Sequence, residues 1–458
     1  MSMNFTKLLP TRYVEMDKKR WFVRSLILVA LGTILSFKLF IYLFIIDRTV
    51  GLYGIVTTTV LFSYFFLSYV KFKDPYFEAQ KNSSSDKPFV SIVIPVKNEE
   101  GFIRNCVQAA IDSTYLHKEI IVVDDGSTDK TGQILDEMSR EANIRVVHNS
   151  TSSGKKRAIE IGADIANGDI YLFTDSDCSI APDALEKAVD IFMSDDKIGS
   201  VTGHGRIRRD PSSKWNTLEK MQDVWYDSQY RIYKGAESSF TTMSCCSGPF
   251  TAYRKAAVKP FLHAWVHDKF FGQEFKFATD RRLTAFVLGA QEKETSNNFG
   301  VVRAEKKSNE SSFAWKMVYS PSIRVFIGTP NTISPLVRQQ IRWRKSFIRS
   351  IFSTGKVFWK RPAIIALLFY LQMSLKIIRP FIILKSLIIL PLMGDYVTAV
   401  LYFSSVCFTS MIYAIDFRLR NPGNGIWLYR PLMTMLSMFV FSWLVFYALF
   451  TIRKTHWR

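Results

Sequence analysis

The 458-residue sequence lacks the motifs that define several common classes of nucleotide-binding enzyme. It contains neither G-x-G-x-x-G nor G-x-x-x-x-G-K-[ST], so neither a dinucleotide fold nor a P-loop is indicated. Its five cysteines include a vicinal pair and form no disulfide framework, which suits a reducing cytosol. Internal repeats are absent, and residues 81–88 (KNSSSDKP) are the one obvious linker.

Acidic residues are scarce relative to basic ones, at 40 Asp and Glu against 60 Lys and Arg, and the net charge is +20. Most of the excess lies near the two ends of the chain. Residues 1–80 and 361–458 together carry 20 basic against 7 acidic residues. Because these regions are also the most apolar, the charge indicates contact with lipid headgroups and argues against nucleic-acid binding.

Apolar residues make up 48% of the chain, and two long runs of them lie near the N-terminus. Residues 21–46 and 49–70 are each long enough to cross about 30 Å of hydrocarbon. The first run is too long and too basic for a signal peptide, and no small-residue cleavage site follows it. Only Asp47 and Arg48 separate the runs, which predicts a hairpin. Both ends of the hairpin are basic, so we expect both ends, and the domain that follows, to be cytosolic.

Three further apolar segments follow Ala363. They are an interrupted run to Met393, a span at 396–415 and a run at 427–452. The last run is basic at both ends. It therefore either crosses the membrane twice, broken near Pro431, or dips in and returns.

From Pro88 onward, short apolar segments alternate with helical stretches. Unbroken Val and Ile runs are typical of parallel strands buried on both faces. Repeated strand–helix units predict a doubly wound α/β sheet with ligands at the carboxyl ends of its strands. The expected strands are residues 89–96, 118–125, 144–149 and 168–177, and the expected helices begin at Glu99, Thr131, Gly154 and Pro182.

Acidic clusters follow two of these strands. VVDDGSTD places Asp124 and Asp125 after one strand, and YLFTDSDC places Asp175 and Asp177 after another. Residues two apart in an extended segment point the same way, so Asp175 and Asp177 can share one Mg²⁺ or Mn²⁺ ion with a diphosphate. Such an ion would neutralise charge on a leaving nucleotide. The alternative is a set of turn aspartates, because Asp favours turns.

Each of two basic segments can either bind a ligand or simply face solvent or lipid. In SSGKKRAIEIGA (152–163), Lys155 and Lys156 stand at a helix start that suits phosphate oxygens, or they form a solvated turn. In RQQIRWRKSFIRS (338–350), five positive charges, with Arg342 among them, surround Trp343, and Gln339 stands close by. This segment is typical of a basic amphipathic helix lying on a lipid surface.

Five ordered motifs resemble those of processive family 2 glycosyltransferases of the GT-A fold. The similarity is strongest to hyaluronan synthases, with chitin-oligosaccharide synthases next, and the C-terminal LFTIRKTHW (449–457) shares it. The resemblance implies an α/β GT-A-type domain, with a mixed, mostly parallel sheet and helices on both faces, embedded between transmembrane and interfacial helices. The motifs are VVDDGSTD (122–129), DSD (175–177), CCSGPFTAYRK (245–255), ATDRRLT (278–284) and RQQIRWRKS (338–346).

The resemblance implies four regions in this chain. The N-terminal segment and hairpin span residues 1–80, and the cytosolic glycosyltransferase domain spans 81–335. Interfacial amphipathic helices follow at 336–362, and the C-terminal transmembrane region with a gating tail occupies 363–458.

The resemblance also implies roles for single residues. Asp280 is the general base that deprotonates the acceptor hydroxyl. Trp343 stacks on the acceptor sugar, while Gln339 and Arg342 contact the donor diphosphate and the acceptor surroundings. Metal binding falls to Asp175 and Asp177. The donor-binding set is Asp124, Asp125, Lys155, Asp175, Cys246, Gly248, Pro249 and Trp457.

Three features depart from the family pattern. Thr279 stands where a second acid is usual, which puts the tuning of Asp280 in question. Residues 291–320 are polar and longer than expected, consistent with a disordered loop or an accessory feature. The chain ends at HWR, where the family has a Trp-Gly-Thr gating motif, so Trp457 is either a gate residue or an interface anchor.

The resemblance implies a multi-pass cell-membrane enzyme, monomeric, that polymerises sugars from UDP-sugar donors onto a growing polysaccharide and passes the polymer outward. Hyaluronan, made from UDP-GlcNAc and UDP-glucuronate, is the first expectation, and a chitin-like homopolymer is the second. A single-step lipid glycosyltransferase and a non-catalytic membrane scaffold are further alternatives. Lys376, Arg379 and Lys385 interrupt an apolar run, and at least one is expected to line a channel for an anionic polymer. Interfacial snorkelling is the alternative for these three side chains.

Overall fold

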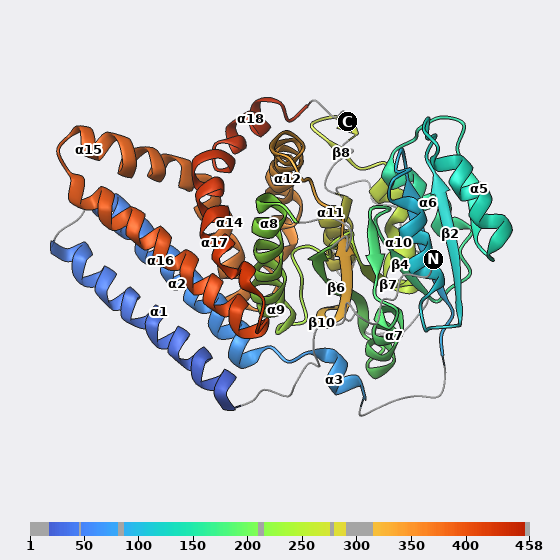
Figure 1. The fold of residues 1–458 in the computed structure, drawn as a ribbon, viewed down its shortest axis with the longest axis horizontal. Helices are drawn as coiled ribbons and strands as arrows, with labels where there is room; N and C mark the ends of the chain where they lie inside the picture. The colour runs from blue at the N-terminus through green and yellow to red at the C-terminus, as the bar shows by residue number, and fades with distance from the viewer. Residues whose placement is uncertain are drawn as a thin grey trace.

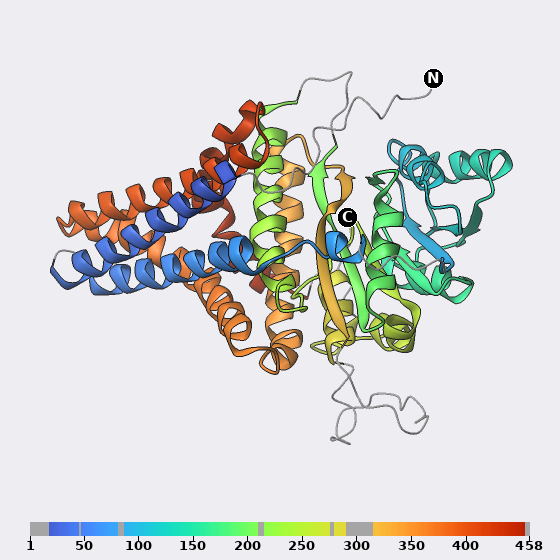
Figure 2. The ribbon, with the colours of Figure 1, turned by 90° about the horizontal axis from the view of Figure 1, so that it is seen from below.

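The structure is a computed structural model, and it describes residues 18–44, 47–80, 87–208, 215–274, 279–289 and 315–453. Figures 1 and 2 show a bundle of long helices beside an α/β domain, with helices α8 (Thr217–Ser228) and α12 (Ile333–Ser353) between them. Trp457 and the larger part of the polar segment 291–320 lie outside the described residues. The end of that segment is strand rather than loop, because β10 begins at Lys316.

The α/β domain is built on an eight-stranded sheet with the order β3-β2-β1-β4-β7-β6-β10-β5. Neighbouring strands are parallel except at β7, which is antiparallel to β4 and β6, and at β5, which is antiparallel to β10. The predicted mixed, mostly parallel sheet is therefore confirmed. The strands are β1 (Val90–Val96), β2 (Lys118–Asp124), β3 (Arg145–His148), β4 (Ile170–Phe173), β5 (Cys178–Ile180), β6 (Ile198–Ile207), β7 (Thr251–Arg254) and β10 (Lys316–Ile327).

Strand register gathers the acidic motifs at one edge of the sheet. Val96 at the end of β1 pairs with Asp124 at the end of β2, and Val93 pairs with Phe173 at the end of β4. Every residue of β1 is buried, as its unbroken apolar sequence predicts for a strand covered on both faces. Because parallel strands end at the same edge, the acids that follow β2 and β4 become neighbours there.

Helices cover the sheet and lead from its strands. α6 starts at Lys155, directly after Gly154, which has a φ of 93° that a glycine adopts without strain. α11 carries Asp280 in its first turn. A small second sheet pairs β8 (Lys269–Phe270) with β9 (Gln273–Glu274). The helices of the domain are α4 (Ile103–Ile111), α5 (Thr131–Glu141), α6 (Lys155–Asp164), α7 (Ala184–Ser194), α9 (Gly235–Ser238), α10 (Lys255–Val266) and α11 (Thr279–Leu288).

Three of the described helical segments are long and apolar enough to cross a membrane: Trp21–Leu43, Arg48–Ala79 and Tyr396–Arg420. The first two form the hairpin that the sequence predicts, α1 (Lys18–Phe44) and α2 (Arg48–Phe66), which lie side by side in Figures 1 and 2. A π-helical turn, Leu67–Lys71, follows α2, and α3 (Pro75–Ala79) comes next. The remaining long helices of the bundle are α14 (Ala363–Leu384), which continues through η6 (Lys385–Ile389) into α15 (Leu390–Leu392), and α16 (Tyr396–Arg420).

The last apolar run bends after Phe441, whereas one of the two alternatives from the sequence places a break near Pro431. Its two parts, Gly425–Phe441 and Leu444–Phe450 (α18), are bent by 41°. Pro431 is the third residue of α17 (Tyr429–Leu436), where a backbone N–H has no helical partner, so proline is tolerated there. In Figures 1 and 2 this run, in dark red, stays near α8 and α12 and does not reach the far end of the bundle.

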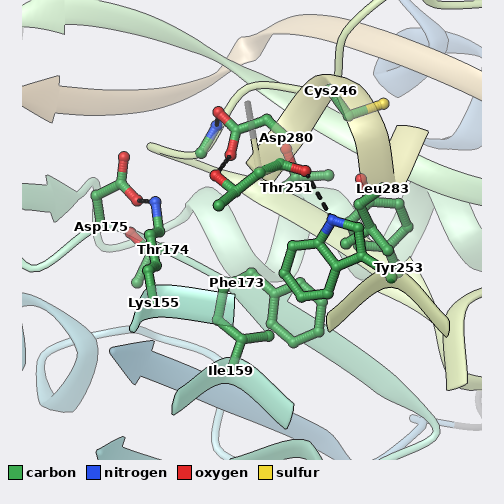
Figure 3. A pocket seen from close by; sticks show the side chains of 13 residues that line it. Lys155, Ile159, Phe173, Thr174, Asp175, Cys246, Thr251, Tyr253, Asp280 and Leu283 are labelled. Atoms are coloured by element: carbon green, nitrogen blue, oxygen red, sulfur yellow. Dashed lines mark hydrogen bonds and ion pairs between the residues drawn. The ribbon is translucent and has the colours of Figure 1, made fainter. Parts of the chain in front are cut away.

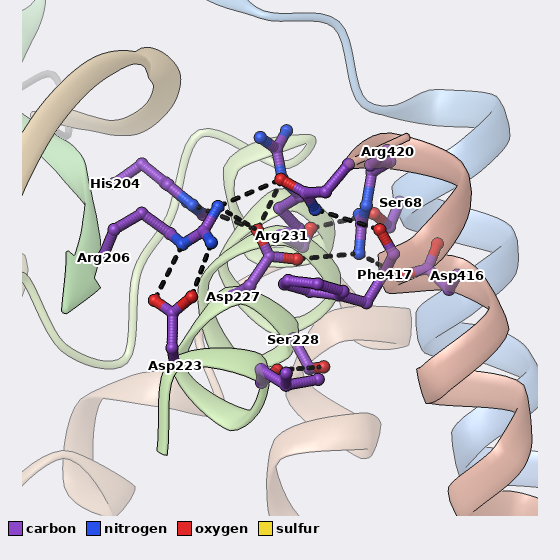
Figure 4. A network of polar contacts seen from close by, with 12 residues as sticks. Ser68, His204, Arg206, Asp223, Asp227, Ser228, Arg231, Asp416, Phe417 and Arg420 are labelled. Atoms are coloured by element: carbon purple, nitrogen blue, oxygen red, sulfur yellow. Dashed lines mark hydrogen bonds and ion pairs between the residues drawn. The ribbon is translucent and has the colours of Figure 1, made fainter. Parts of the chain in front are cut away.

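A buried ionic network joins the α/β domain to the bundle (Figure 4). At its centre is Asp227 of α8, whose side chain is fully buried. Its carboxylate lies 3.1 Å from Arg231 Nε and 3.3 Å from both Arg420 Nη2 of α16 and His204 Nε2 of β6. Burial would raise the pKa of Asp227, but Arg420 and Arg231 outweigh it and hold the pKa well below its ordinary value. Asp227 is therefore a charged link between the two parts.

The network continues on both sides of Asp227. Arg206 of β6 makes two hydrogen bonds, of 2.9 and 2.6 Å, to Asp223, one turn earlier on α8. On the bundle side, Arg420 pairs with Asp416, which also accepts a hydrogen bond from the Tyr69 hydroxyl. Removing one member of a buried ion pair commonly costs about 3–5 kcal/mol, so this network fixes how α8 sits between sheet and bundle.

Candidate active site

A pocket opens at the carboxyl edge of β4, between α6 and α11 (Figure 3). Its lining combines charged groups on one side with apolar and hydroxyl side chains on the other. The lining residues are Lys155, Ile159, Phe173, Thr174, Asp175, Cys246, Gly248, Thr251, Tyr253, Trp265, Thr279, Asp280 and Leu283.

Lys155 and Asp175 form an ion pair on one side of the pocket. Lys155 is the first residue of α6, and Asp175 follows β4 by two residues. Burial would lower the pKa of Lys155, but Asp175 and Asp280 more than offset this and raise it above its ordinary value. Lys155 is thus a permanent cation at a helix start, which is the arrangement that binds phosphate oxygens.

Asp280 faces the same pocket from the first turn of α11. Its Oδ2 accepts a hydrogen bond of 2.9 Å from the Gly248 backbone N–H, and its Oδ1 accepts one of 2.9 Å from the Thr279 hydroxyl. Thr279 stands where the resemblance implies a second acid, and its hydroxyl donates to Asp280 and holds the Asp280 carboxylate in place. The indole N–H of Trp265 fixes the start of α11 by donating to the Thr279 carbonyl at 3.1 Å.

Gly248 lies between the two carboxylates of the pocket. A Cβ at this position would be 2.7 Å from Asp175 Oδ2 and 3.1 Å from Asp280 Oδ2. Only a residue without a side chain lets the Gly248 backbone approach both acids and donate to one of them.

Gly248→Ala should lower turnover by about 10²-fold, because the added methyl group displaces Asp175, Asp280 or both, and small misplacements of reacting groups carry costs of that order. The measurement is the rate of nucleotide release together with a thermal unfolding curve. Gly101→Ala is the matched control, since a Cβ there would meet nothing within 4 Å. Equal turnover in the two variants would show that Gly248 does not need to be small.

Two of the other donor-site candidates, Cys246 and Pro249, lie at this pocket. Cys246 lines it, and the carbonyl of Pro249 accepts a hydrogen bond from the Thr174 hydroxyl at 2.8 Å. Asp124 is turned into its own loop: its Oδ1 accepts from the Ser127 N–H at 3.0 Å, and its Oδ2 lies 3.0 Å from His148 Nδ1. Asp124 is therefore not brought into the pocket.

Asp125 anchors the loop that leads to Lys155. Its carboxylate accepts hydrogen bonds of 2.7 Å from the Ser153 and Gly154 backbone N–H groups and of 2.7 Å from the Ser152 hydroxyl. Burial would raise the pKa of Asp125, but these donors outweigh it and keep the pKa below its ordinary value. In this structure Asp125 positions the loop before α6 and, through it, Lys155.

Asp175 and Asp177 fit the predicted metal site in their chemistry. One ligand atom from each, with Cys178 Sγ, lies within 4.8 Å of the others. Burial and the charges of Asp177 and Asp175 raise the pKa of Cys178 well above its ordinary value. Its sulfur is also a soft ligand, whereas hard cations prefer oxygen. Two carboxylates suit a hard cation such as Mg²⁺ or Mn²⁺, and a nucleotide diphosphate would supply further oxygens.

Gln339, Arg342 and Trp343 lie on α12, and none of them lines the pocket. Trp343 stacks on Trp225 of α8, with ring centroids 5.9 Å apart and planes 16° apart, and meets Tyr226 edge-on at 6.1 Å. Burial, and then nearby charges that include Asp177 and Asp175, raise the pKa of Tyr226 well above its ordinary value. The aromatic surface of α8 and α12 therefore adjoins the acidic cluster.

Several residues of this site are not indicated by the sequence alone. Trp225 and Tyr226 sit in a helix, α8, that lies outside the recognised motifs, although Asn216 and Glu219 form a capping box that marks its start. Trp265 lines the pocket but looks like an ordinary core residue in the sequence. Thr251 and Tyr253 also line the pocket, and they lie within the CCSGPFTAYRK motif, whose resemblance assigns no role to either. The buried amide oxygen of Gln339 accepts no hydrogen bond within the described part of the chain, so it is available to a ligand.

Comparisons with known proteins agree with this geometry. Residues 91–262 match the family model described as glycosyl transferase family 2. A hyaluronan synthase of Streptococcus pyogenes serotype M3 is 26% identical over 446 residues, which cover 95% of this chain and 97% of that protein. An N-acetylglucosaminyltransferase of Rhizobium meliloti is 28% identical over 269 residues, 58% of this chain and 57% of that protein.

A solved structure supports the fold. A mannosyltransferase from Pyrobaculum calidifontis, in complex with GDP-Man and Mn²⁺, matches 88% of this chain and 99% of its own, with a TM-score of 0.51 and 15% identity. The predicted GT-A-type fold class is confirmed, and apolar helices flank the domain on both sides in the sequence. Residues 91–262 thus match the model of glycosyl transferase family 2, in a chain similar to a hyaluronan synthase along 95% of its length.

Proposed function

We propose that this chain is a multi-pass membrane enzyme that polymerises UDP-GlcNAc and UDP-glucuronate processively and moves the polymer across the membrane. The observation that carries the proposal is one pocket that unites the Lys155–Asp175 ion pair with Asp280, next to the helices that join the bundle. The catalytic domain then lies on the cytosolic side, where UDP-sugars are available and where the basic flanks of the hairpin belong.

Each charged group has a role in the transfer. Asp280 accepts the proton of the acceptor hydroxyl while the acceptor oxygen forms a bond to the anomeric carbon of the donor and the bond to the diphosphate breaks. Lys155 stabilises the negative charge that develops on the leaving diphosphate. Asp175 and Asp177 would hold Mg²⁺ or Mn²⁺, which as a bound Lewis acid adds to that charge stabilisation.

The aromatic surface of Trp343 and Trp225 is suited to the acceptor. Sugar rings present C–H faces that pack on aromatic rings, and Trp343 lies beside Tyr226, which adjoins the acidic cluster. Gln339 contributes a buried acceptor atom without a partner among the described residues, which suits a sugar hydroxyl. The acceptor thus enters between α8 and α12 and presents its hydroxyl to Asp280.

Four neighbouring cations on α11, α12 and α14 favour an anionic polymer. Arg281 follows Asp280 in α11, and it acts electrostatically on Lys376 of α14 together with Arg344 and Arg379. No carboxylate within the described residues lies within ion-pair distance of these four cations. Lys376 and Arg379 are exposed at the surface of α14, and Arg281 and Arg344 are half-buried. Charges of one sign at membrane depth normally face protein or water, and glucuronate would neutralise them.

Lys385 does not belong to this group of cations, although it interrupts the same apolar run as Lys376 and Arg379. Its ammonium pairs with Asp47 at 2.9 Å and with the Thr49 hydroxyl at 3.1 Å. These contacts tie η6 to the tip of the α1–α2 hairpin. Lys385 therefore serves as a control for the loss of a charge in the same helical run.

Lys376→Met and Arg379→Met should shorten the polymer, whereas Lys385→Met should not. A charged hydrogen bond contributes about 1.5–3 kcal/mol, so its loss should speed release of the growing chain by roughly tenfold or more. Gel filtration of the product measures its length. Unchanged length in a Lys376/Arg379 double variant would rule out a cationic channel.

Incubation of the purified protein with each UDP-sugar singly and in pairs tests the function. A polymer that forms only when UDP-GlcNAc and UDP-glucuronate are both present supports the proposal. Polymer from UDP-GlcNAc alone would establish the second candidate, a chitin-like homopolymer synthase. Absence of metal-dependent UDP release with any donor would favour the non-catalytic scaffold.

A further inference from the structure

Asp268, just beyond the end of α10, binds two arginines from two different helices. Its carboxylate accepts hydrogen bonds of 2.9 and 3.0 Å from Nε and Nη2 of Arg282. The same carboxylate accepts from Nη2 of Arg349. The Asp268 side chain is 10% exposed and that of Arg349 is 3% exposed, so both are largely removed from solvent.

The two arginines belong to the two helices that carry the chemistry. Arg282 lies two residues after Asp280 on α11, and Arg349 lies six residues after Trp343 on α12. A single carboxylate thus links the helix of the proposed base to the helix of the proposed acceptor surface. Charge-assisted contacts to planar guanidinium groups fix direction as well as distance.

The segment that carries Asp268 is itself anchored to the pocket. Three residues earlier, Trp265 donates to the Thr279 carbonyl at the start of α11. The Trp265 carbonyl accepts a hydrogen bond of 3.0 Å from Lys156 of α6, which is buried next to Lys155. The turn from Trp265 to Asp268 therefore touches α6, α11 and α12, the three helices that carry Lys155, Asp280 and Trp343.

We propose that Asp268 is a positioning residue that sets the separation between the base Asp280 and the acceptor surface of Trp343. The inference rests on the proposed function, which gives these two residues their roles. Asp268 touches neither donor nor acceptor. Its loss leaves two guanidinium groups without their shared carboxylate, and α11 and α12 are then free to shift relative to each other.

Such a shift has a signature that general destabilisation lacks. The donor site is formed by α6 and the loop beyond β4, so UDP still binds. The acceptor hydroxyl is no longer held against the anomeric carbon of the donor, so water can attack that carbon instead. The fraction of donor that is hydrolysed therefore rises as the fraction transferred falls.

The test compares Asp268→Asn, Arg349→Gln and the double variant in the full-length protein with UDP-GlcNAc and UDP-glucuronate. Asn keeps the shape of Asp but removes its charge. Asp164→Asn is the matched control, because Asp164 pairs with Lys259 on the surface at 2.8 Å, with 58% of its side chain exposed. Calorimetry gives the UDP affinity, and paired assays of UDP release and sugar incorporation give the partition between hydrolysis and transfer.

Each single variant should lose about 10²-fold in sugar incorporation while keeping UDP affinity within about twofold, and the double variant should lose no more than the worse single. Arg349→Lys, which keeps the charge but loses the planar fork, should recover only part of the activity. Three results would each overturn the proposal. They are a wild-type ratio of hydrolysis to transfer in Asp268→Asn, losses of incorporation that add in the double variant, and a UDP affinity that falls together with sugar incorporation. If the wild-type protein makes no polymer, the proposed function fails instead.

Discussion

Asp177→Ala should abolish Mg²⁺- or Mn²⁺-dependent turnover while the protein stays folded and membrane-inserted. Asp177 and Asp175 are the carboxylates that gather at the end of β4, and the buried Cys178 thiol beside them is not a suitable replacement ligand. A bound divalent ion contributes several kcal/mol of charge stabilisation. A loss of about 4 kcal/mol corresponds to roughly a thousandfold in rate. The measurement is UDP release as a function of Mn²⁺ concentration.

Binding data make this prediction specific to the metal. Wild-type protein should bind UDP more tightly with Mn²⁺ than with a chelator, and Asp177→Ala should bind equally weakly in both. Asp183→Ala is the control, because Asp183 lies in the same stretch of chain but pairs with Lys187 at the surface at 2.6 Å. If Asp177→Ala keeps normal Mn²⁺-dependent activity, the ion is held by other residues.

The sheet and its acidic edge could be predicted because their determinants are local. Unbroken Val and Ile runs define β1 and β2, and the carboxyl ends of parallel strands share an edge. The sequence therefore predicts that the acids after β2 and β4 lie at the same edge of the sheet. Which way each carboxylate turns is set by the loops. Asp125 accepts hydrogen bonds from the backbone N–H groups of Ser153 and Gly154, and Asp124 turns toward His148. No strand pattern encodes these contacts.

The helices between sheet and bundle were harder to predict because their partners are distant in sequence. α8 carries Asp223 and Asp227 one turn apart, which in isolation indicates a solvated face. Arg206 and Arg420 come from strand β6 and from α16, and they bury both acids. A buried charge is acceptable only where such partners converge, and convergence is a property of the fold.

The same reasoning applies to Asp268 and Trp265. In the sequence, Trp265 looks like a core residue and Asp268 like a turn residue. Only the packing of α10 against α11 and α12 shows that the indole N–H holds the Thr279 carbonyl and that the carboxylate joins two arginines. Motifs locate the groups that react. The groups that position them become visible when helices from different parts of the chain meet.

Asp280→Asn should bind UDP and UDP-sugars with near-native affinity yet make no polymer. The amide cannot accept the acceptor proton, and loss of a general base commonly costs about 10²- to 10⁴-fold in rate. Asn keeps the size of Asp and an oxygen that can still accept from the Gly248 N–H, so the pocket keeps its shape. Donor binding depends instead on Lys155 and the acids after β4. Calorimetry with UDP and incorporation of labelled sugar separate the two properties.

Trp343→Ala provides the contrast that identifies the role of Asp280. Its loss removes the stack on Trp225 and weakens acceptor positioning, but the base remains, so some donor should still be hydrolysed to UDP. Asp280→Asn should show neither transfer nor hydrolysis above background, because attack by water also needs a proton acceptor. Elongation by Asp280→Asn at a comparable rate would mean that the base lies elsewhere. Loss of UDP binding in the same variant would assign Asp280 to the donor site and overturn the division of roles.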